Sequence, residues 1–252
     1  MKSFLKIIGS VIIVYVIVFS CNKIISNKLE KNINKDLKNI NTASFTNESF
    51  ENKNSTLNCE RELLFDSNNL CFPKIENWKE CRIDKNLKSD VDNLELNNKI
   101  LAFYIPIEIY EKSKTEKIVN YPVISLFVHS STIGMKTTKE ALPMVFAGLK
   151  NSFEVQDWKY VEDLLKTKTN AEFIKPVLFD SYDITNKVKT CVTINSSKFA
   201  GKVIQRVSFI NILDLKQRIV MLNYSKEIGK NFQYSKMKVE NDIIVKKITE
   251  AN

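Results

Sequence analysis

The sequence predicts an α+β protein, an antiparallel sheet packed by helices, after an N-terminal signal or anchor segment and a disordered tether. Three observations predict this arrangement. Residues 188–224 contain three stretches in which apolar and polar residues alternate, as they do in a sheet with one buried face. A helix-capping pattern begins at Thr137, and apolar residues recur at helical spacing after Tyr234. A Lys-flanked apolar run opens the chain, which is typical of an export signal.

The composition excludes several classes of protein. Of 252 residues, 44% are hydrophobic, which is enough for a globular core and excludes a wholly disordered chain. Lys and Arg number 38 against 29 Asp and Glu, a net charge of +9. The two signs are interspersed, and no basic stripe with interleaved aromatic residues is present, so nucleic acid is not an expected partner.

The N-terminal apolar run predicts export. Lys2 and Lys6 precede the stretch Ile7–Ser20, which is 14 residues long, shorter than the about 20 residues of a spanning helix. The run ends in Val18-Phe19-Ser20-Cys21, which resembles a bacterial lipoprotein box. The resemblance implies that Cys21 is lipidated and becomes the first residue of the mature protein. Lipid chains stabilise membrane attachment by about 0.8 kcal/mol for each buried methylene.

An uncleaved signal anchor is the alternative, because Phe19 occupies a position that is small or aliphatic in the lipoprotein box. Lysines also follow the run closely, at Lys23 and Lys28, so the positive-inside rule does not orient it. In both cases we expect attachment to the cell membrane or outer membrane, with the folded part facing the periplasm or exterior.

The next segment, residues 22–58, is rich in Asn and Lys and predicts a flexible tether, since it has too few apolar residues to offset chain entropy. Its first half has one apolar stripe at Ile25, Leu29, Ile33 and Leu37, typical of a fraying amphipathic helix. We therefore expect three parts: residues 1–21 as signal or anchor, 22–58 as tether, and 59–252 as one extracytoplasmic domain.

Cysteine usage agrees with export. With Cys21 set aside, four cysteines remain, and an even number in an exported domain predicts disulfides. We expect two bridges, one local and one that joins the remaining cysteine to Cys191; the candidates are Cys59, Cys71, Cys81 and Cys191. No C-x-x-C pair and only one histidine are present, so no metal site is expected.

The first half of the domain combines strands and helices. Expected strands are Leu70–Ile75, ending at Pro73, then Ile100–Ile109 and Tyr121–His129, which are rich in β-branched and aromatic residues. Pro106 in the second strand indicates an edge or a bulge. Thr137 and Glu140 form a capping box for a helix through ALPMVFAGLKNSF, with a restart at Pro143 as the alternative. A second helical segment is expected from Val155 to about Lys168.

The second half predicts a meander and a final helix. Its three strands lie near 188–195, 202–213 and 220–224, with turns at Ser196–Gly201 and around Asp214. The last element is a helix that places Tyr234, Met237, Ile244, Val245 and Ile248 on one side, over the sheet.

This order of elements resembles the PsbP/Mog1-like family of α+β domains and, within it, the DcrB-type bacterial lipoproteins. The matching segments lie within residues 62–249 and are LCFPKIENW, PVISLFVHSS, GKVIQRVSFINILDLKQRIVMLNYS and VENDIIVKKI. Members of this family bind partners or assist assemblies, so the resemblance implies a protein partner and transfers no catalytic residue.

Motifs for catalysis are missing. His129 is the single histidine, so a hydrolase would have to use it with Ser130, Ser131 or Cys191 as nucleophile. No G-x-S-x-G elbow and no Gly-rich phosphate loop is present, and no cofactor is expected. Trp78 and Trp158 are interpreted as core or sheet-covering residues, with a ligand cleft as the alternative.

The sequence therefore predicts a membrane-tethered, non-catalytic binding or accessory protein of the cell envelope. Two alternatives remain: an immunity protein that neutralises a secreted toxin, and an envelope hydrolase that uses His129.

Overall fold

A computed structural model describes most of the chain from Cys59 onward. The described residues are 59–92, 98–115, 121–129, 132–133, 136–155, 159, 172–199 and 202–252. The predictions for residues 1–58, Cys21 included, lie outside them, as does most of the second helical segment expected after Val155.

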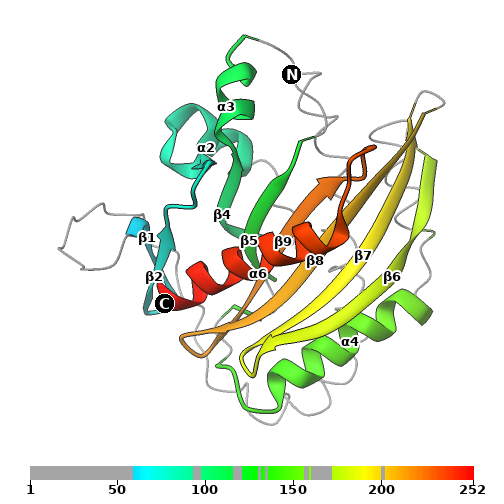
Figure 1. Ribbon diagram of the computed structural model, residues 1–252. Coiled ribbons are helices and arrows are strands. Elements are labelled where there is room, and N and C mark those ends of the chain that lie inside the picture. The colour runs from blue at the N-terminus through cyan, green and yellow to red at the C-terminus, as the bar shows by residue number, and fades with distance from the viewer. Residues whose placement is uncertain are drawn as a thin grey trace.

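A seven-stranded antiparallel sheet dominates the fold, which confirms the α+β class (Figure 1). The strand order is β3-β4-β5-β9-β8-β7-β6, so β6 and β3 are the outer strands. The bounds are β3 Trp78–Glu80, β4 Asn98–Pro106, β5 Val123–His129, β6 Glu172–Thr185, β7 Val188–Phe199, β8 Lys202–Leu215 and β9 Arg218–Glu227. The strands expected near 121–129, 188–195, 202–213 and 220–224 correspond to β5, β7, β8 and β9.

A separate two-stranded hairpin precedes the sheet. It is formed by β1 (Cys59–Phe65) and β2 (Asn68–Pro73), and β2 is the strand expected at Leu70–Ile75. The helical elements are the short η2 (Cys81–Ile83), then α2 Lys85–Asp92, α3 Ile107–Ser113, α4 Ala141–Val155 and α6 Tyr234–Glu250.

Two helices lie on opposite faces of the large sheet. The expected C-terminal helix is α6, which crosses the face that we call the front (Figure 1) and buries Met237, Ile244 and Val245 in the main core. Helix α4 packs on β6, β7 and β8 from the back, where Lys189 of β7 lies 5.4 Å from the Phe146 ring. Val188 belongs to the core on the front face, and successive residues of a strand point to opposite faces of the sheet. Lys189 therefore points to the back, so α4, which it contacts, lies on the face opposite to α6.

Tight turns set the register of two hairpins. Asp66 and Ser67 both have positive φ, 47° and 64°, and so do Lys216 and Gln217, 48° and 61°. Two central residues with positive φ form the two-residue loop that matches the twist of the flanking strands. The turn expected around Asp214 therefore lies at Lys216–Gln217, and Asp214 belongs to β8.

Several boundaries differ from the predictions. The strand expected at Ile100–Ile109 ends at Pro106, where the backbone (φ −56°, ψ 139°) leads directly into α3. The turn expected at Ser196–Gly201 is shorter, because β7 continues to Phe199. Strands β1, β3 and β6 were not predicted. In β6 the alternation is broken, since its pairing with β7 shifts register at three points.

The helix expected after Thr137 is α4, but its predicted cap is wrong. The Thr137 hydroxyl has no hydrogen-bond partner, and the Thr137 N–H donates to the Gln217 carbonyl at 2.8 Å. Pro143 lies in the first turn of α4, where backbone N–H groups have no partner within the helix. The helix therefore begins at Ala141 and needs no restart at Pro143.

Candidate interaction surface

Exposed apolar side chains gather at one end of the sheet. Ten large hydrophobic side chains of the described residues are exposed, and four of them lie on β6 and β8. They are Ile174 (40% exposed), Val177 (59%), Phe179 (53%) and Val203 (56%). We call these four residues the front patch. Exposed apolar residues are ordinary when scattered, but a cluster marks an interaction site.

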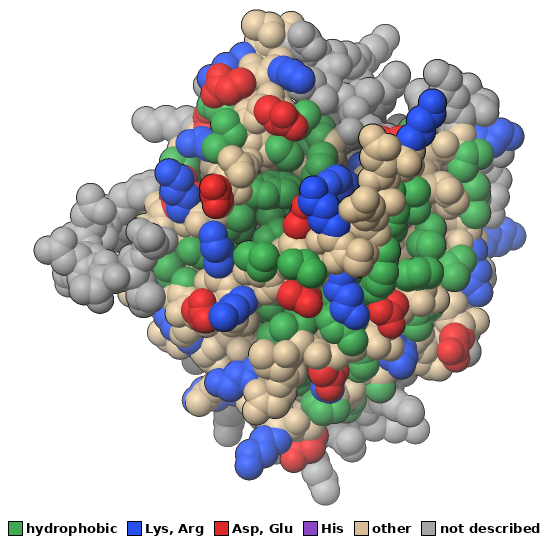
Figure 2. All heavy atoms as spheres, viewed as in Figure 1, with side chains coloured by type: hydrophobic (Ala, Val, Ile, Leu, Met, Phe, Trp, Pro, Cys, Tyr) green, Lys and Arg blue, Asp and Glu red, His purple; other side chains and the backbone are tan. Residues whose placement is uncertain are grey.

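Strand register places the patch on the front face. Residues directly opposite one another in an antiparallel pair point to the same side. Val177 stands opposite Ile194, and Ile194 stands opposite Val207, a residue of the front core. Closer to the end of the sheet, Ile174 stands opposite Ser196, two residues after Ile194 on the same face. Val203 lies on β8 four residues before Val207, so it also faces the front. Figure 2 shows hydrophobic side chains on this part of the front face, to the right of α6.

Aromatic rings support the patch from the helix side. The Phe179 ring meets the Tyr234 ring edge-on at 5.1 Å, and Tyr234 stacks on Phe209 at 5.9 Å. Phe209 stacks in turn on Tyr224, which meets Trp78 edge-on at 5.9 Å. This row crosses the front face from β6 to β3, and aromatic pairs of this kind stabilise a fixed arrangement.

A satisfied carboxylate lies beside the patch. Tyr234 donates its hydroxyl proton to Asp180 Oδ2 at 2.6 Å, and the Ser181 N–H donates to Asp180 Oδ1 at 2.7 Å. Lys238 Nζ lies 3.7 Å from the same carboxylate. The hydrogen bond from Tyr234, with these further contacts, holds the pKa of Asp180 below its usual value. Asp180 thereby fixes the first turn of α6 against β6.

A buried polar network fixes α6 further along. Asn241 of α6 and Asn211 of β8 are both fully buried and exchange hydrogen bonds at 2.8 and 3.1 Å. Thr190 donates to Asn211 at 2.8 Å, and Tyr182 donates to Asp242 at 2.8 Å. This network was not predicted from the sequence. The available signal was that Asn211 and Asn241 occupy positions where the strand and helix periods call for apolar residues.

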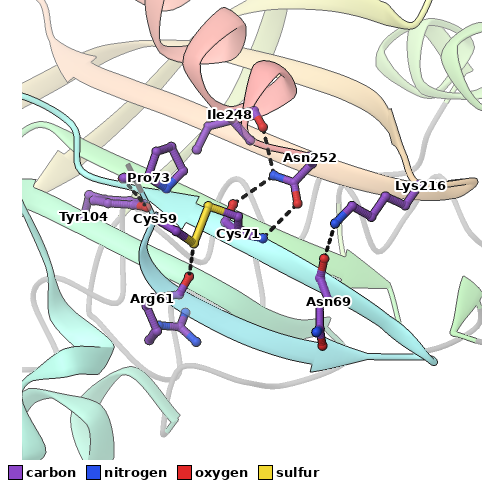
Figure 3. The surroundings of a disulfide bond; sticks show 9 residues. All are labelled: Cys59, Arg61, Asn69, Cys71, Pro73, Tyr104, Lys216, Ile248 and Asn252. Carbon is purple, nitrogen blue, oxygen red and sulfur yellow. Dashed lines mark hydrogen bonds between the residues drawn. A yellow bond between two sulfur atoms is a disulfide. The ribbon is translucent and has the colours of Figure 1, made fainter. Parts of the chain in front are cut away.

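A disulfide closes the β1–β2 hairpin where the described chain begins (Figure 3). Cys59 and Cys71 are bonded with their Cα atoms 5.5 Å apart, which confirms the local bridge expected from the cysteine count. Asn252 binds the backbone of Cys71 and also donates to the Ile248 carbonyl at 2.8 Å, and Lys216 reaches the Asn69 carbonyl. The bridge is thus connected to the end of α6.

The second expected disulfide is wrong. Cys81 and Cys191 are buried free thiols. Cys81 directly follows β3 and Cys191 lies in β7, five strand spacings apart, which amounts to about 24 Å. A bridge needs Cα atoms within about 7 Å. Burial raises the pKa of the Cys81 thiol, which makes this sulfur unreactive.

The structure does not bring His129 and Cys191 together. His129 ends β5, as expected, but β9 and β8 separate it from β7, so at least about 14 Å lies between the two residues. Burial lowers the pKa of His129 below its usual value. A Cys-His pair is therefore excluded, while the serine alternatives, Ser130 and Ser131, lie outside the described residues.

Two further sequence candidates are tryptophans. Trp78 is half-buried against the front core and contacts Tyr224, so the interpretation as a sheet-covering residue is confirmed. Trp158 lies outside the described residues. Within the described part of the chain, no three His, Cys, Asp or Glu side chains are grouped so as to hold a metal ion. Across that same part, no helix has the length and apolar character needed to cross a membrane.

Comparisons with known proteins give a weak resemblance in fold. No protein-family model matches the sequence, and no curated protein matches it significantly. Two solved structures resemble the fold, both with a TM-score of 0.30 over 76% of this chain and 89% of theirs. One is a point mutant of the protein Mog1, 12% identical, and the other is the Ran-binding protein Mog1p of Saccharomyces cerevisiae, 10% identical. The resemblance expected from the sequence is thus shown only as a distant similarity to Mog1 structures.

Proposed function

We propose that this chain is a membrane-tethered extracytoplasmic protein that binds a protein partner and catalyses no reaction, with lipid attached at Cys21. The apolar run that ends in Ser20-Cys21 supports attachment. The Cys59–Cys71 bridge supports an oxidising compartment, because structural disulfides persist outside the cytosol.

The front patch is the observation that carries the binding function. Its side chains are apolar and more than a third exposed, although the strands beneath them are well packed. Exposure of clustered apolar surface lowers solubility and is retained where a partner covers it. The aromatic row and the Asp180–Tyr234 hydrogen bond hold the patch in one arrangement, so little entropy is lost when a partner binds.

Cross-linking of the full chain in its own cells tests the binding function. The wild-type chain is expected to give one stoichiometric protein adduct, and Val177→Asp is expected to lower its yield about tenfold. Leu64→Asp is the matched control, because Leu64 is 67% exposed on β1, away from the patch. An adduct that forms equally with Val177→Asp would contradict binding through the patch.

The proposed anchor has a separate test. Labelling with a palmitate analogue is expected to mark the wild-type chain and to leave Cys21→Ala unlabelled. An uncleaved signal anchor would instead leave both chains unlabelled and in the membrane fraction. Recovery of the wild-type chain in the soluble fraction would contradict both forms of attachment.

A further inference from the structure

We infer that the protein segment bound by the front patch presents apolar side chains flanked by carboxylates. This inference rests on the proposed function and names the chemistry of the partner. It follows from the charges around the patch and from the geometry of the outer strand.

The charge around the patch is positive. Lys226 stands opposite Val207, so it lies on the front face in the same row of the sheet as Val177. Lys230 is exposed in the loop after β9, and the Ile228 N–H in that loop donates to the Gln205 carbonyl of β8 at 2.8 Å.

The carboxylates described near the patch do not offset these lysines. Asp180 accepts hydrogen bonds from Tyr234 and Ser181 and is neutralised by Lys238. Glu227 stands opposite Arg206, one residue from the front-facing pair of Val207 and Lys226, so it points to the back of the sheet. A partner with carboxylates around an apolar centre is therefore complementary, whereas a basic partner is repelled.

The partner binds the face of β6, since the edge of this strand is poorly suited to pairing. Strand β6 is the outer strand, but its register shifts between Ile174 and Val177, and Pro176 in that gap has no N–H to donate. Bulges and proline are devices that keep edge strands from pairing with other chains. Recognition then depends on side chains: apolar contact with Val177, Phe179 and Val203, and ion pairs with the lysines.

Selection from a display library of random short peptides on the purified full chain tests this inference. We expect the selected peptides to be enriched in large apolar residues together with Asp and Glu, and to bind more weakly at high salt. Val177→Asp is expected to lower their affinity about tenfold and Lys226→Glu about threefold, the size of an exposed ion pair. The controls are Leu64→Asp and Lys187→Glu, the latter exposed in the turn at the opposite end of the β6–β7 hairpin.

The outcomes separate this inference from the proposed function. Two results overturn the inference and leave binding through the patch intact. In the first, the selected peptides need Val177 but are not enriched in acidic residues. In the second, their affinity is unchanged by Lys226→Glu. Peptides that bind Val177→Asp as well as the wild-type chain overturn both. A library that yields no binder also overturns the inference.

Discussion

Asn252, two residues beyond α6, forms a reciprocal pair of hydrogen bonds with the backbone of Cys71. Its Oδ1 accepts from the Cys71 N–H at 2.8 Å, and its Nδ2 donates to the Cys71 carbonyl at 2.8 Å. The side chain therefore pairs with the backbone N–H and C=O of Cys71, as the backbone of a neighbouring strand would. It thereby attaches the β1–β2 hairpin to the end of the last helix.

Replacing Asn252 by Ala is expected to lower the free energy of unfolding by about 2–3 kcal/mol, because three hydrogen bonds to the backbone are lost, two with Cys71 and one with Ile248. Urea denaturation of the full chain measures this change. Asn252→Asp keeps the acceptor and loses the donor, so an intermediate loss is expected. Equal stability of all three chains would show that the contact contributes nothing.

Substitution in the buried ion pair between Arg61 and Glu80 is expected to lower the free energy of unfolding more than Asn252→Ala does. Arg61 donates to Glu80 at 3.0 Å and to the Leu101 carbonyl, and Glu80 also accepts the Phe103 N–H at 3.2 Å. Arg61→Met leaves a buried carboxylate without its counterion, which costs about 3–5 kcal/mol.

A double-mutant cycle checks this prediction. Combining Arg61→Met with Glu80→Gln is expected to cost less than the sum of the two single changes, because the remaining partner is no longer charged. Additive losses in chemical denaturation would contradict coupling between the two side chains.

Thiol counting distinguishes one bridge from two. In a Cys21→Ala chain, denatured without reduction, two reactive thiols are expected, those of Cys81 and Cys191. None would indicate the second bridge, and four would indicate that Cys59–Cys71 does not form in the isolated protein.

Removing the Cys59–Cys71 bridge is expected to lower the free energy of unfolding by about 3 kcal/mol, the usual value for a loop of this length. The two cysteines are 12 residues apart. Cys71→Ser measures the loss in denaturation experiments, and Cys191→Ser serves as control for the exchange of sulfur for oxygen in a buried strand. A smaller loss for Cys71→Ser than for the control would contradict the prediction.

His129 is expected to make stability depend on mildly acidic pH. Its pKa in the folded protein lies below 6.5 because of burial, so the unfolded chain binds the proton more tightly. Stability is therefore complete above pH 6.5, falls as pH decreases from there to the folded pKa, and does not fall further on account of this group. The slope of unfolding free energy against pH, measured for the wild-type chain and His129→Asn, checks this. Equal slopes would contradict it.

The sequence predicted the parts of the fold whose signal is periodic. Strands β5, β7, β8 and β9 and helix α6 carry regular apolar spacing, and the structure places all of them. β6 was missed because Pro176 and its register shifts break the alternation. β1 was missed because Arg61 points into the core, where it is paired with Glu80 across 19 residues of chain. Such long-range pairing leaves no local pattern.

The candidate surface was less predictable than the fold. Val177 and Val203 look like ordinary core residues in the sequence, and only the order of the strands shows that nothing described covers them. The cysteine count correctly predicted a bridge, but parity alone implied a second one. A second bridge is excluded because Cys81 and Cys191 lie at distant places in the strand order. The number of cysteines carries no information about these places.

The connection from Cys59 through Cys71 to Asn252 also defines a load path. A pull on the chain ahead of Cys59 enters β2 through the covalent sulfur bond and reaches the end of α6 through Asn252. The hydrogen bonds between β1 and β2 are bypassed, so tension cannot open this hairpin one pair at a time from its free end. Mechanical resistance along this path is therefore set by its weakest step, the two Asn252–Cys71 hydrogen bonds and the packing of α6, because the covalent sulfur bond is far stronger than either.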